Sequence, residues 1–323
     1  MRRLAWVKSA KTLLDDCLNV KPGEELLIVT DTNQLPIAEL LAMLGQERGA
    51  ETMVLTMTPR TRHGEELPRV VAAAMKAADA CLAPTTFSVN HTKARAEACA
   101  AGMRLVFMPG VSEAVFTSGS LEVDYKANAV TIEKMAAAMT EASMAHVTSA
   151  EGTDLWVEIA GRESVAQTGI VDAPGKISPP PSIECAIAPL EGKTHGVWVI
   201  DGPIVPPGGM VAEPVSVHFE AGRITRIDGG PSAERLRDLL ESYNDPNMYC
   251  PVELGVGLNP KVRCGQGIQI EDEAEFGTMH IGLGSGITFG SSIRAVGHVD
   301  VVAMHPVLDL DGRVVLKDRQ VLL

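Results

Sequence analysis

The chain has 323 residues, of which 46% are hydrophobic and 21% are charged. This balance excludes an intrinsically disordered protein and allows one large domain or two ordinary ones. The formal net charge of -13 argues against a protein that binds nucleic acid, because phosphate contacts require clustered lysine and arginine.

No segment of the sequence predicts export or a membrane span. The stretch 1–16 begins with two arginines, but charged residues interrupt its apolar ones, so it lacks the apolar centre of a signal peptide. No apolar run approaches the roughly 20 residues that a membrane span needs. The six cysteines are scattered without a Cys-x-x-Cys pair, which is typical of reduced, buried thiols in a cytosolic protein. We therefore expect a cytoplasmic protein with no membrane partner.

The first half of the chain alternates strand-like and helix-like segments. Short apolar runs predict strands at 25–30, 52–56, 80–83 and 104–108. Apolar residues at helical spacing predict helices at 36–48, 66–78 and about 91–101. This alternation predicts an α/β domain with a parallel sheet. Neither glycine-rich nucleotide motif occurs at a strand-to-helix turn, so a nucleotide site in this half is not supported.

The second half is rich in strands. A long helix is predicted at about 127–144, and strands separated by glycine and proline turns follow it. These strands are expected at 154–159, 196–200, 215–219 and 223–227, with one helix near 231–243. We therefore predict an α/β domain at 1–148 and a mostly β (α+β) metal-binding catalytic domain at 149–323.

His298 and Asp300 form the sharpest local feature. Residues two apart in a strand project from the same face, so this imidazole and this carboxylate would point into one space. Zinc, manganese and ferrous iron all accept such nitrogen and oxygen ligands. His280 lies in a second strand-like segment, where Gly282 and Gly284 on its own face leave room for a metal.

Two glutamates complete the candidate site. Glu253 is followed by Gly255 and Gly257 on its own face. Glu184 follows three prolines and enters an apolar stretch, where a carboxylate is costly to bury unless it is paired or bound to metal. Each feature alone also fits an ordinary polar pair or a core histidine. Together they predict a metal site that could activate a water and polarise a carbonyl.

The order of these motifs resembles the aminopeptidase T family of dinuclear metallo-aminopeptidases. The matching motifs are ECAIAP at Glu184, ELGVGLNP at Glu253, GTMHIGLG at His280, and HVD at His298 and Asp300. The resemblance covers about 150–312. It implies that these five residues hold one or two divalent ions (zinc, cobalt or manganese), and that Glu184 and Glu253 serve as catalytic base or bridge. It also implies a homodimer that hydrolyses an amide bond of a small substrate or short peptide.

Two features depart from that family. The catalytic tyrosine expected after His280 is missing, because Ile287 and Phe289 occupy that stretch. The chain is also shorter than the peptidases. The resemblance therefore supports the metal site more strongly than it supports peptidase activity.

The sequence also resembles the 2,5-dihydroxypyridine 5,6-dioxygenases, which are related in fold and use one ferrous ion held by two histidines and a carboxylate. The residues GLNP at 257–260 and the position of His195 after Glu184 favour this alternative. Against it, Glu253 stands where the first histidine of that triad would fall, and His280 would have no role. The metallohydrolase is the main prediction, the dioxygenase is the alternative, and a binding protein with a vestigial site is a third reading.

Other polar residues are candidates for supporting roles. Arg294 and His195 are predicted to bind substrate. Glu273 and Glu275 are predicted to orient the ligand imidazoles as hydrogen-bond acceptors.

Overall fold

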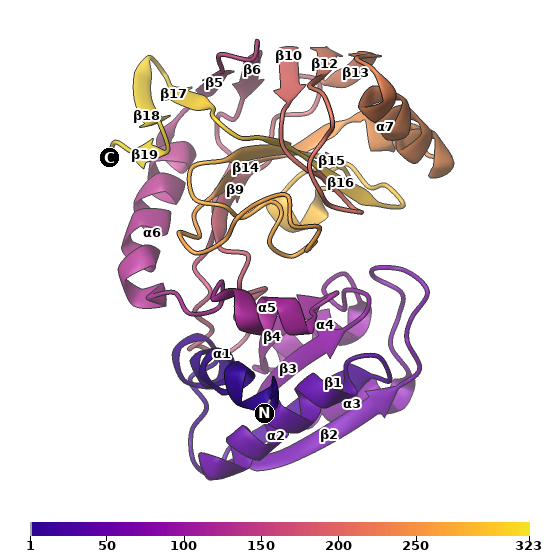
Figure 1. The fold of residues 1–323 in the computed structure, drawn as a ribbon, viewed down its shortest axis with the longest axis vertical. Coiled ribbons are helices and arrows are strands. Elements are labelled where there is room, and N and C mark those ends of the chain that lie inside the picture. Colours follow the sequence, from indigo (N-terminus) through magenta and orange to yellow (C-terminus); the bar gives the residue numbers. More distant parts are fainter. Residues whose placement is uncertain (1) are drawn as a thin grey trace. The chain divides into compact units, whose positions relative to one another are not determined.

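The computed structural model describes residues 2–323, and the chain divides into two compact units. One unit comprises Met1–Ala129 and Thr168–Ile183, and the other comprises Val130–Gln167 and Glu184–Leu323. The first is α/β and the second is mostly β, as the sequence predicts (Figure 1). The border predicted at 148/149 differs from this division, because the chain returns to the first unit at Thr168–Ile183. As a domain border it stays a prediction.

The first unit contains a five-stranded parallel sheet with the order β2-β1-β3-β4-β8. Its strands are β1 (Glu25–Asp31), β2 (Glu51–Met57), β3 (Ala80–Thr85), β4 (Arg104–Pro109) and β8 (Ile177–Ser178). Its helices and helical turns are η1 (Arg2–Trp6), α1 (Val7–Thr12), η2 (Leu13–Cys17), α2 (Leu35–Glu47), α3 (Arg69–Ala77), α4 (Lys93–Ala100) and α5 (Glu113–Ser118). The central strand β3 is buried along its whole length, which explains why its sequence is a continuous apolar run rather than an alternating one.

The strands and helices predicted for this half are confirmed, with ends that shift by a few residues. The helices before β1, the helix α5 and the strand β8 were not predicted. β8 contains only two residues, and it comes from the segment that returns to this unit after the long helix. Periodicity cannot detect a strand this short.

In the second unit an eight-stranded antiparallel sheet has the order β13-β12-β10-β6-β5-β17-β18-β19. Its strands are β5 (Met144–Thr148), β6 (Asp154–Glu158), β10 (Thr194–Ile200), β12 (Val215–Glu220), β13 (Arg223–Asp228), β17 (Val307–Leu310), β18 (Arg313–Lys317) and β19 (Gln320–Val321). α7 (Pro231–Ser242) packs against β12 and β13. The helix predicted at 127–144 is α6 (Tyr125–Glu141), which ends earlier because Met144 already begins β5.

The second sheet of this unit has six strands in the order β11-β16-β15-β14-β9-β7, and all neighbours are antiparallel. The strands are β7 (Val165–Gln167), β9 (Glu184–Ile187), β11 (Ile204–Val205), β14 (Pro251–Gly257), β15 (Met279–Gly284) and β16 (His298–Ala303). Two short turns lie beside them, η3 (Pro246–Tyr249) and η4 (Ile287–Phe289). β9, β14 and β15 are buried at every position, so a polar side chain there needs a specific partner.

All six cysteines are free and buried, which agrees with the prediction of reduced thiols. None of the helices in residues 2–323 is both long enough and apolar enough to cross a membrane. The predicted cytoplasmic location and homodimer stay predictions.

Candidate metal centre

The five predicted ligands lie on four neighbouring strands of the six-stranded sheet. β9 carries Glu184, β14 carries Glu253, β15 carries His280, and β16 carries His298 and Asp300. Because directly paired residues on adjacent strands point to the same face, the register brings all five side chains to one face of the sheet.

Each of these ligands is paired with a glycine on an adjacent strand. Gly257 faces Glu184, and Gly255 faces His280. Gly282 lies between Glu253 on one side and Asp300 on the other, and Gly284 faces His298. The pairing of β14 with β15 is regular from Glu253 to Val256, and an irregularity in the register lies just before it, between Pro251 and Glu253.

The glycines make room for the two imidazole rings. A Cβ atom at Gly255 would collide with Nε2 of His280. A Cβ atom at Gly282 would lie 2.7 Å from Nε2 of His298 and 2.8 Å from Cβ of Glu253. Each ring therefore lies over a bare stretch of the neighbouring backbone, and alanine at either position would displace a ligand.

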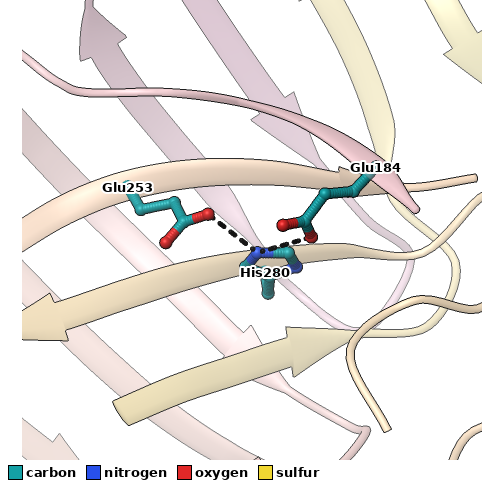
Figure 2. A group of neighbouring side chains, drawn as sticks. All are labelled: Glu184, Glu253 and His280. Carbon is teal, nitrogen blue, oxygen red and sulfur yellow. Dashed lines mark hydrogen bonds and ion pairs between the residues drawn. The ribbon is translucent and has the colours of Figure 1, made fainter. Parts of the chain in front are cut away.

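The inner part of the site consists of Glu184, Glu253 and His280 (Figure 2). The two carboxylates approach the ring from opposite sides, with Oε2 of Glu184 and Oε1 of Glu253 each 3.5 Å from Nε2 of His280. Their side chains are 2–4% exposed. Gln167 donates a hydrogen bond to Oε1 of Glu184. Within residues 2–323, Oε2 of Glu184 is a buried oxygen without a hydrogen-bond partner.

The outer part consists of Glu253, His298 and Asp300. Nε2 of His298 lies 3.1 Å from Oε2 of Glu253 and 3.0 Å from Oδ1 of Asp300. The opposite ring nitrogen, Nδ1, donates to the backbone oxygen of Ser285 over 3.0 Å. This hydrogen bond fixes the ring so that Nε2 faces the carboxylates as a ligand. The His298 side chain is 25% exposed, so the outer part reaches the surface.

These residues fit a divalent cation. In the described part of the chain, two groups of three side chains have the spacing of a metal site, and they share Glu253. Oxygen and imidazole donors suit zinc, manganese and ferrous iron. Oε2 of Glu184 has no hydrogen-bond partner and faces Nε2 of His280, so it is available as a donor to a metal. Each group has one histidine and two carboxylates, which differs from the two-histidine, one-carboxylate triad usual for ferrous iron.

The buried charges shift the protonation of these side chains. Burial raises the pKa of Glu184 to about 8, a rise that His280 opposes. Burial alone would lower the pKa of His280, yet its hydrogen bond with Glu253 and the nearby carboxylates raise that pKa to about 10. The pKa of His298 also rises despite burial, because Asp300 and Glu253 stabilise the imidazolium form. Protons are thus bound at the positions where a cation would bind.

A sixth acidic residue belongs to the site. Glu273 lies in the loop between β14 and β15, and its side chain hydrogen-bonds Asp300. Burial, reinforced by the charge of Asp300, raises the pKa of Glu273 well above its ordinary value. The backbone oxygen of Glu275 would lie 2.5 Å from a Cβ atom at Gly257, so this loop crosses directly over the sheet there.

The structure corrects the prediction for one of the two loop glutamates, Glu275. Glu273 hydrogen-bonds the carboxylate of Asp300, and its role in orienting an imidazole stays a prediction. Glu275 accepts hydrogen bonds from Arg319 and from the backbone N–H of Cys264, the latter over 2.8 Å. It holds the loop together rather than orienting a ligand.

The two residues predicted to bind substrate lie outside the metal groups. Arg294 is exposed in the loop 285–297, which leads into β16 and ends beside His298. His195 is exposed on β10, in the eight-stranded sheet, where it is paired with Trp156. Their roles in substrate binding stay predictions.

The sequence analysis missed two partners of the ligands, Gln167 and Ser285. Gln167 lies in the three-residue strand β7, too short to be predicted, and is paired with Glu184. Ser285 contributes its backbone oxygen, for which no residue-type pattern exists. The position of Ser285 directly after the glycines of β15 is the only signal that could have pointed to it.

Comparisons with known proteins place this geometry in context. A family model described as NicX, 2,5-dihydroxypyridine 5,6-dioxygenase, matches residues 5–322. A 2,5-dihydroxypyridine 5,6-dioxygenase from Pseudomonas putida KT2440 is 28% identical over 188 residues, which are 55% of this chain and 54% of that protein. The chain therefore spans about half the length of the curated relative that it matches.

Two solved structures share the fold. The 2,5-dihydroxypyridine dioxygenase from Pseudomonas putida KT2440 superimposes with a TM-score of 0.85 and 19% identity, covering 98% of this chain and 96% of the other. Wild-type AmpT from Thermus thermophilus superimposes with a TM-score of 0.73 and 17% identity over 100% of both chains. At these identities the likeness shows the fold alone.

The hydrolase prediction is wrong, because the family match over residues 5–322 is to dioxygenases. The fold relation to aminopeptidase T is real, but it carries no amide hydrolysis to this chain. The five residues quoted for the resemblance are brought together, so the error lies in the reaction and not in the grouping of the side chains. The same ligand types serve both chemistries, and the sequence motifs could not separate them.

The first prediction concerns Gly282. In Gly282→Ala the new methyl group displaces His298 and Glu253, and we expect metal affinity to fall by about 10- to 100-fold, the usual effect of misplacing a ligand. Isothermal titration with Mn²⁺ measures this affinity. The matched control is Gly230→Ala, where the three atoms nearest to an added Cβ all belong to the Glu213 side chain, the closest at 3.2 Å. Equal affinities in both variants would contradict the argument.

The second prediction concerns pH. With its pKa raised to about 10, His280 is protonated near neutral pH, and a metal ion that binds there must displace that proton. Affinity for Mn²⁺ should therefore rise with pH, by on the order of tenfold per pH unit for each proton released. Titrations at pH 6, 7 and 8 in buffers of different ionisation enthalpy count the protons. An affinity that is flat over this range would show that the ligands are already deprotonated.

Proposed function

The chain belongs to the 2,5-dihydroxypyridine 5,6-dioxygenase family, and on this premise we propose that it is a metal-dependent dioxygenase that opens the ring of a small dihydroxylated aromatic compound. The proposed metal is a single ferrous ion held by Glu253, His298 and Asp300. In this reaction a carbon–carbon bond of the ring breaks and the product keeps both atoms of O₂.

The observation that carries the position of the metal is the difference in access between the two groups. The inner side chains are 2–4% exposed, whereas His298 is 25% exposed. A catalytic metal needs an open position for substrate, and a closed set of ligands leaves none. The outer group is therefore the one that a ring compound can reach. A ferrous ion there would supply the redox chemistry that lets O₂ react with the ring.

In this proposal the inner residues hold Glu253 in place. Its Oε1 lies 3.5 Å from Nε2 of His280, while Oε2 faces His298. Glu184 lies on the far side of the same imidazole and is itself held by Gln167. The chain Gln167–Glu184–His280–Glu253 thus fixes the carboxylate that would ligate the metal. Glu253 is proposed as a ligand and Glu184 as a positioning residue, in place of the base or bridge of a hydrolase.

Two further expectations are kept as proposals. Arg294, exposed in the loop beside His298, is placed to meet an anionic or hydroxylated substrate from the solvent side. His195 lies in the other sheet, and only its position after Glu184 in the sequence favours a role. The proposal also keeps the predicted cytoplasmic location and homodimer.

The third prediction tests the activity itself. Protein loaded anaerobically with Fe²⁺ should consume O₂ in the presence of 2,5-dihydroxypyridine, and His298→Ala should reduce this rate at least about 100-fold because it removes a ligand. His218→Ala is the matched control, since His218 also pairs with a carboxylate, Asp228 at 2.9 Å, but lies in the eight-stranded sheet. Equal loss in both variants, or no O₂ uptake by the unaltered protein, would contradict the proposal.

The fourth prediction uses Glu253. In the dioxygenase relatives a histidine is expected at this place in the triad, so Glu253→His exchanges one ligand for another and should retain iron binding and O₂ uptake. Glu253→Ala removes the donor and should lose both. Anaerobic titration with Fe²⁺, followed by oxygen-electrode assays, measures each variant.

Glu184→Gln shows how many metals the site needs. If one ion in the outer group suffices, this variant keeps its bound iron and most of its activity, because the amide can still contact His280. Loss of one of two bound ions together with O₂ uptake would show that the inner group also holds a metal.

For the Glu253 variants, a loss of iron in Glu253→His to the same degree as in Glu253→Ala would contradict the outer triad.

A further inference from the structure

Two aromatic rings flank the exposed ligand His298. Phe289, in the turn η4, has its ring centroid 6.0 Å from that of His298, with the ring planes tilted by 38°. Tyr243, just after α7, lies over Gly297, the residue before His298; a Cβ atom there would be 2.5 Å from Cε1 of the tyrosine. Both rings are half-buried. Aromatic residues make up only 4% of the chain, and two of them lie beside this one residue.

The loop 285–297, which carries Phe289, is closed at its base. The backbone N–H of Ser285 donates to the oxygen of Gly297 over 2.9 Å, and the oxygen of Ser285 accepts from His298. Next to this base, Asn247 donates to the backbone oxygen of Arg294 over 2.8 Å. The start and the end of the loop are thus fixed relative to the metal ligand.

The tip of the loop is held by an ion pair, Arg162 with Glu191. Nη1 of Arg162 donates to the backbone oxygen of Gly290 over 2.5 Å. Oε1 of Glu191 accepts from the backbone N–H of Ser292 over 2.7 Å and from the Ser291 hydroxyl over 3.1 Å. These hydrogen bonds lower the pKa of Glu191 to about 2 despite its partial burial, so it stays charged at any working pH.

We propose that Phe289 and Tyr243 form an aromatic rim that binds the flat ring of the substrate beside His298, and that the Arg162–Glu191 pair positions this rim. The inference rests on the proposed function, since that function supplies the aromatic substrate. Aromatic faces stack with offset or edge-on geometry at centroid distances of about 4.5–7 Å, which is the spacing that Phe289 already has to the imidazole. In this proposal a planar ring contacts Phe289 and Tyr243 while it lies beside His298 in the outer metal group.

In this proposal, the absence of the aminopeptidase tyrosine is relevant to substrate binding. Phe289 occupies the stretch in which the aminopeptidases have their tyrosine, and a phenyl ring offers a surface but no hydroxyl. Tyr243 comes from a different element and presents its phenol next to His298. The phenol of Tyr243 can donate a hydrogen bond to a ring hydroxyl or ring nitrogen of the substrate.

The experiment compares binding of metal with binding of the ring. Phe289→Leu and Tyr243→Leu remove one aromatic ring each, and Phe276→Leu is the matched control, a half-buried phenylalanine in the loop after β14. Each protein is titrated first with Fe²⁺ and then, loaded and without oxygen, with 2,5-dihydroxypyridine and with the non-planar 1,4-cyclohexanediol. Steady-state O₂ uptake gives KM and kcat.

The rim predicts that Phe289→Leu and Tyr243→Leu weaken binding of 2,5-dihydroxypyridine by about tenfold or more. The affinities of these two variants for Fe²⁺ and for 1,4-cyclohexanediol should change less than about twofold. In the control Phe276→Leu, the affinity for 2,5-dihydroxypyridine should also change less than about twofold. Glu191→Ala should raise KM more than it lowers kcat, and Glu191→Gln, which keeps the Oε1 acceptor, should restore KM. Unchanged ring binding in both rim variants, or a loss of Fe²⁺ affinity in step with it, overturns the proposal.

The two proposals fail in distinguishable ways. If the unaltered protein binds 2,5-dihydroxypyridine through Phe289 and Tyr243 but shows no O₂ uptake, the dioxygenase proposal falls and the rim stands. If O₂ uptake is present and the rim variants bind the ring as well as the unaltered protein does, the rim falls and the dioxygenase stands. If the unaltered protein binds no aromatic ring, both are overturned.

Discussion

Large polar side chains can gather on one face of a buried sheet only where the facing strands leave space for them. In this protein glycine supplies that space at every ligand of the candidate metal centre, and the closest cases are Gly255 beneath His280 and Gly282 beneath His298. The constraint is steric and therefore strict, because a single methyl group at either position would overlap a ring or a ligand carbon. Strand order and register together place a glycine opposite each ligand.

The same arrangement gathers several carboxylates in the buried part of the sheet. Glu184 and Glu253 are buried on strands that are apolar at their other positions, and Asp300 is nearly so. Isolated carboxylates in such a place would be strongly destabilising, so their charge must be offset by the two imidazoles or by a bound cation. The carboxylates raise the pKa values of His280 and His298, because a protonated imidazole offsets the negative charge next to it. A divalent cation would offset the charge of the carboxylates more effectively, because it carries two charges and binds several oxygen donors at once.

Much of this could be predicted from the sequence because the relevant signals are local. A histidine and an aspartate two residues apart specify one face of a strand, and glycines at the same period specify a cleared surface. The parallel sheet could be predicted because the alternation of strands and helices is also visible in short segments of the sequence. The contacts that could not be predicted join segments that are distant in the sequence. They are the contact of Gln167 with Glu184, which the short strand β7 makes possible, and the contact of Glu273 with Asp300, which depends on a loop. The prediction of the reaction was wrong for a different reason, because the same metal ligands can serve a hydrolase and a dioxygenase.

Chemistry at such a site is therefore set less by the ligands than by what surrounds them. The inner group is enclosed, and an enclosed group of ligands can only hold a cation or fix its neighbours. The outer group opens at His298, where the loop 285–297 and Tyr243 determine which molecules can approach. In the proposal, a substrate in that position contacts Phe289 of the loop and Tyr243 beside it before it reaches the carboxylates. Selection of a planar compound, as proposed, requires Phe289 to stay in place beside His298, and the hydrogen bonds at the base and at the tip of the loop hold it there.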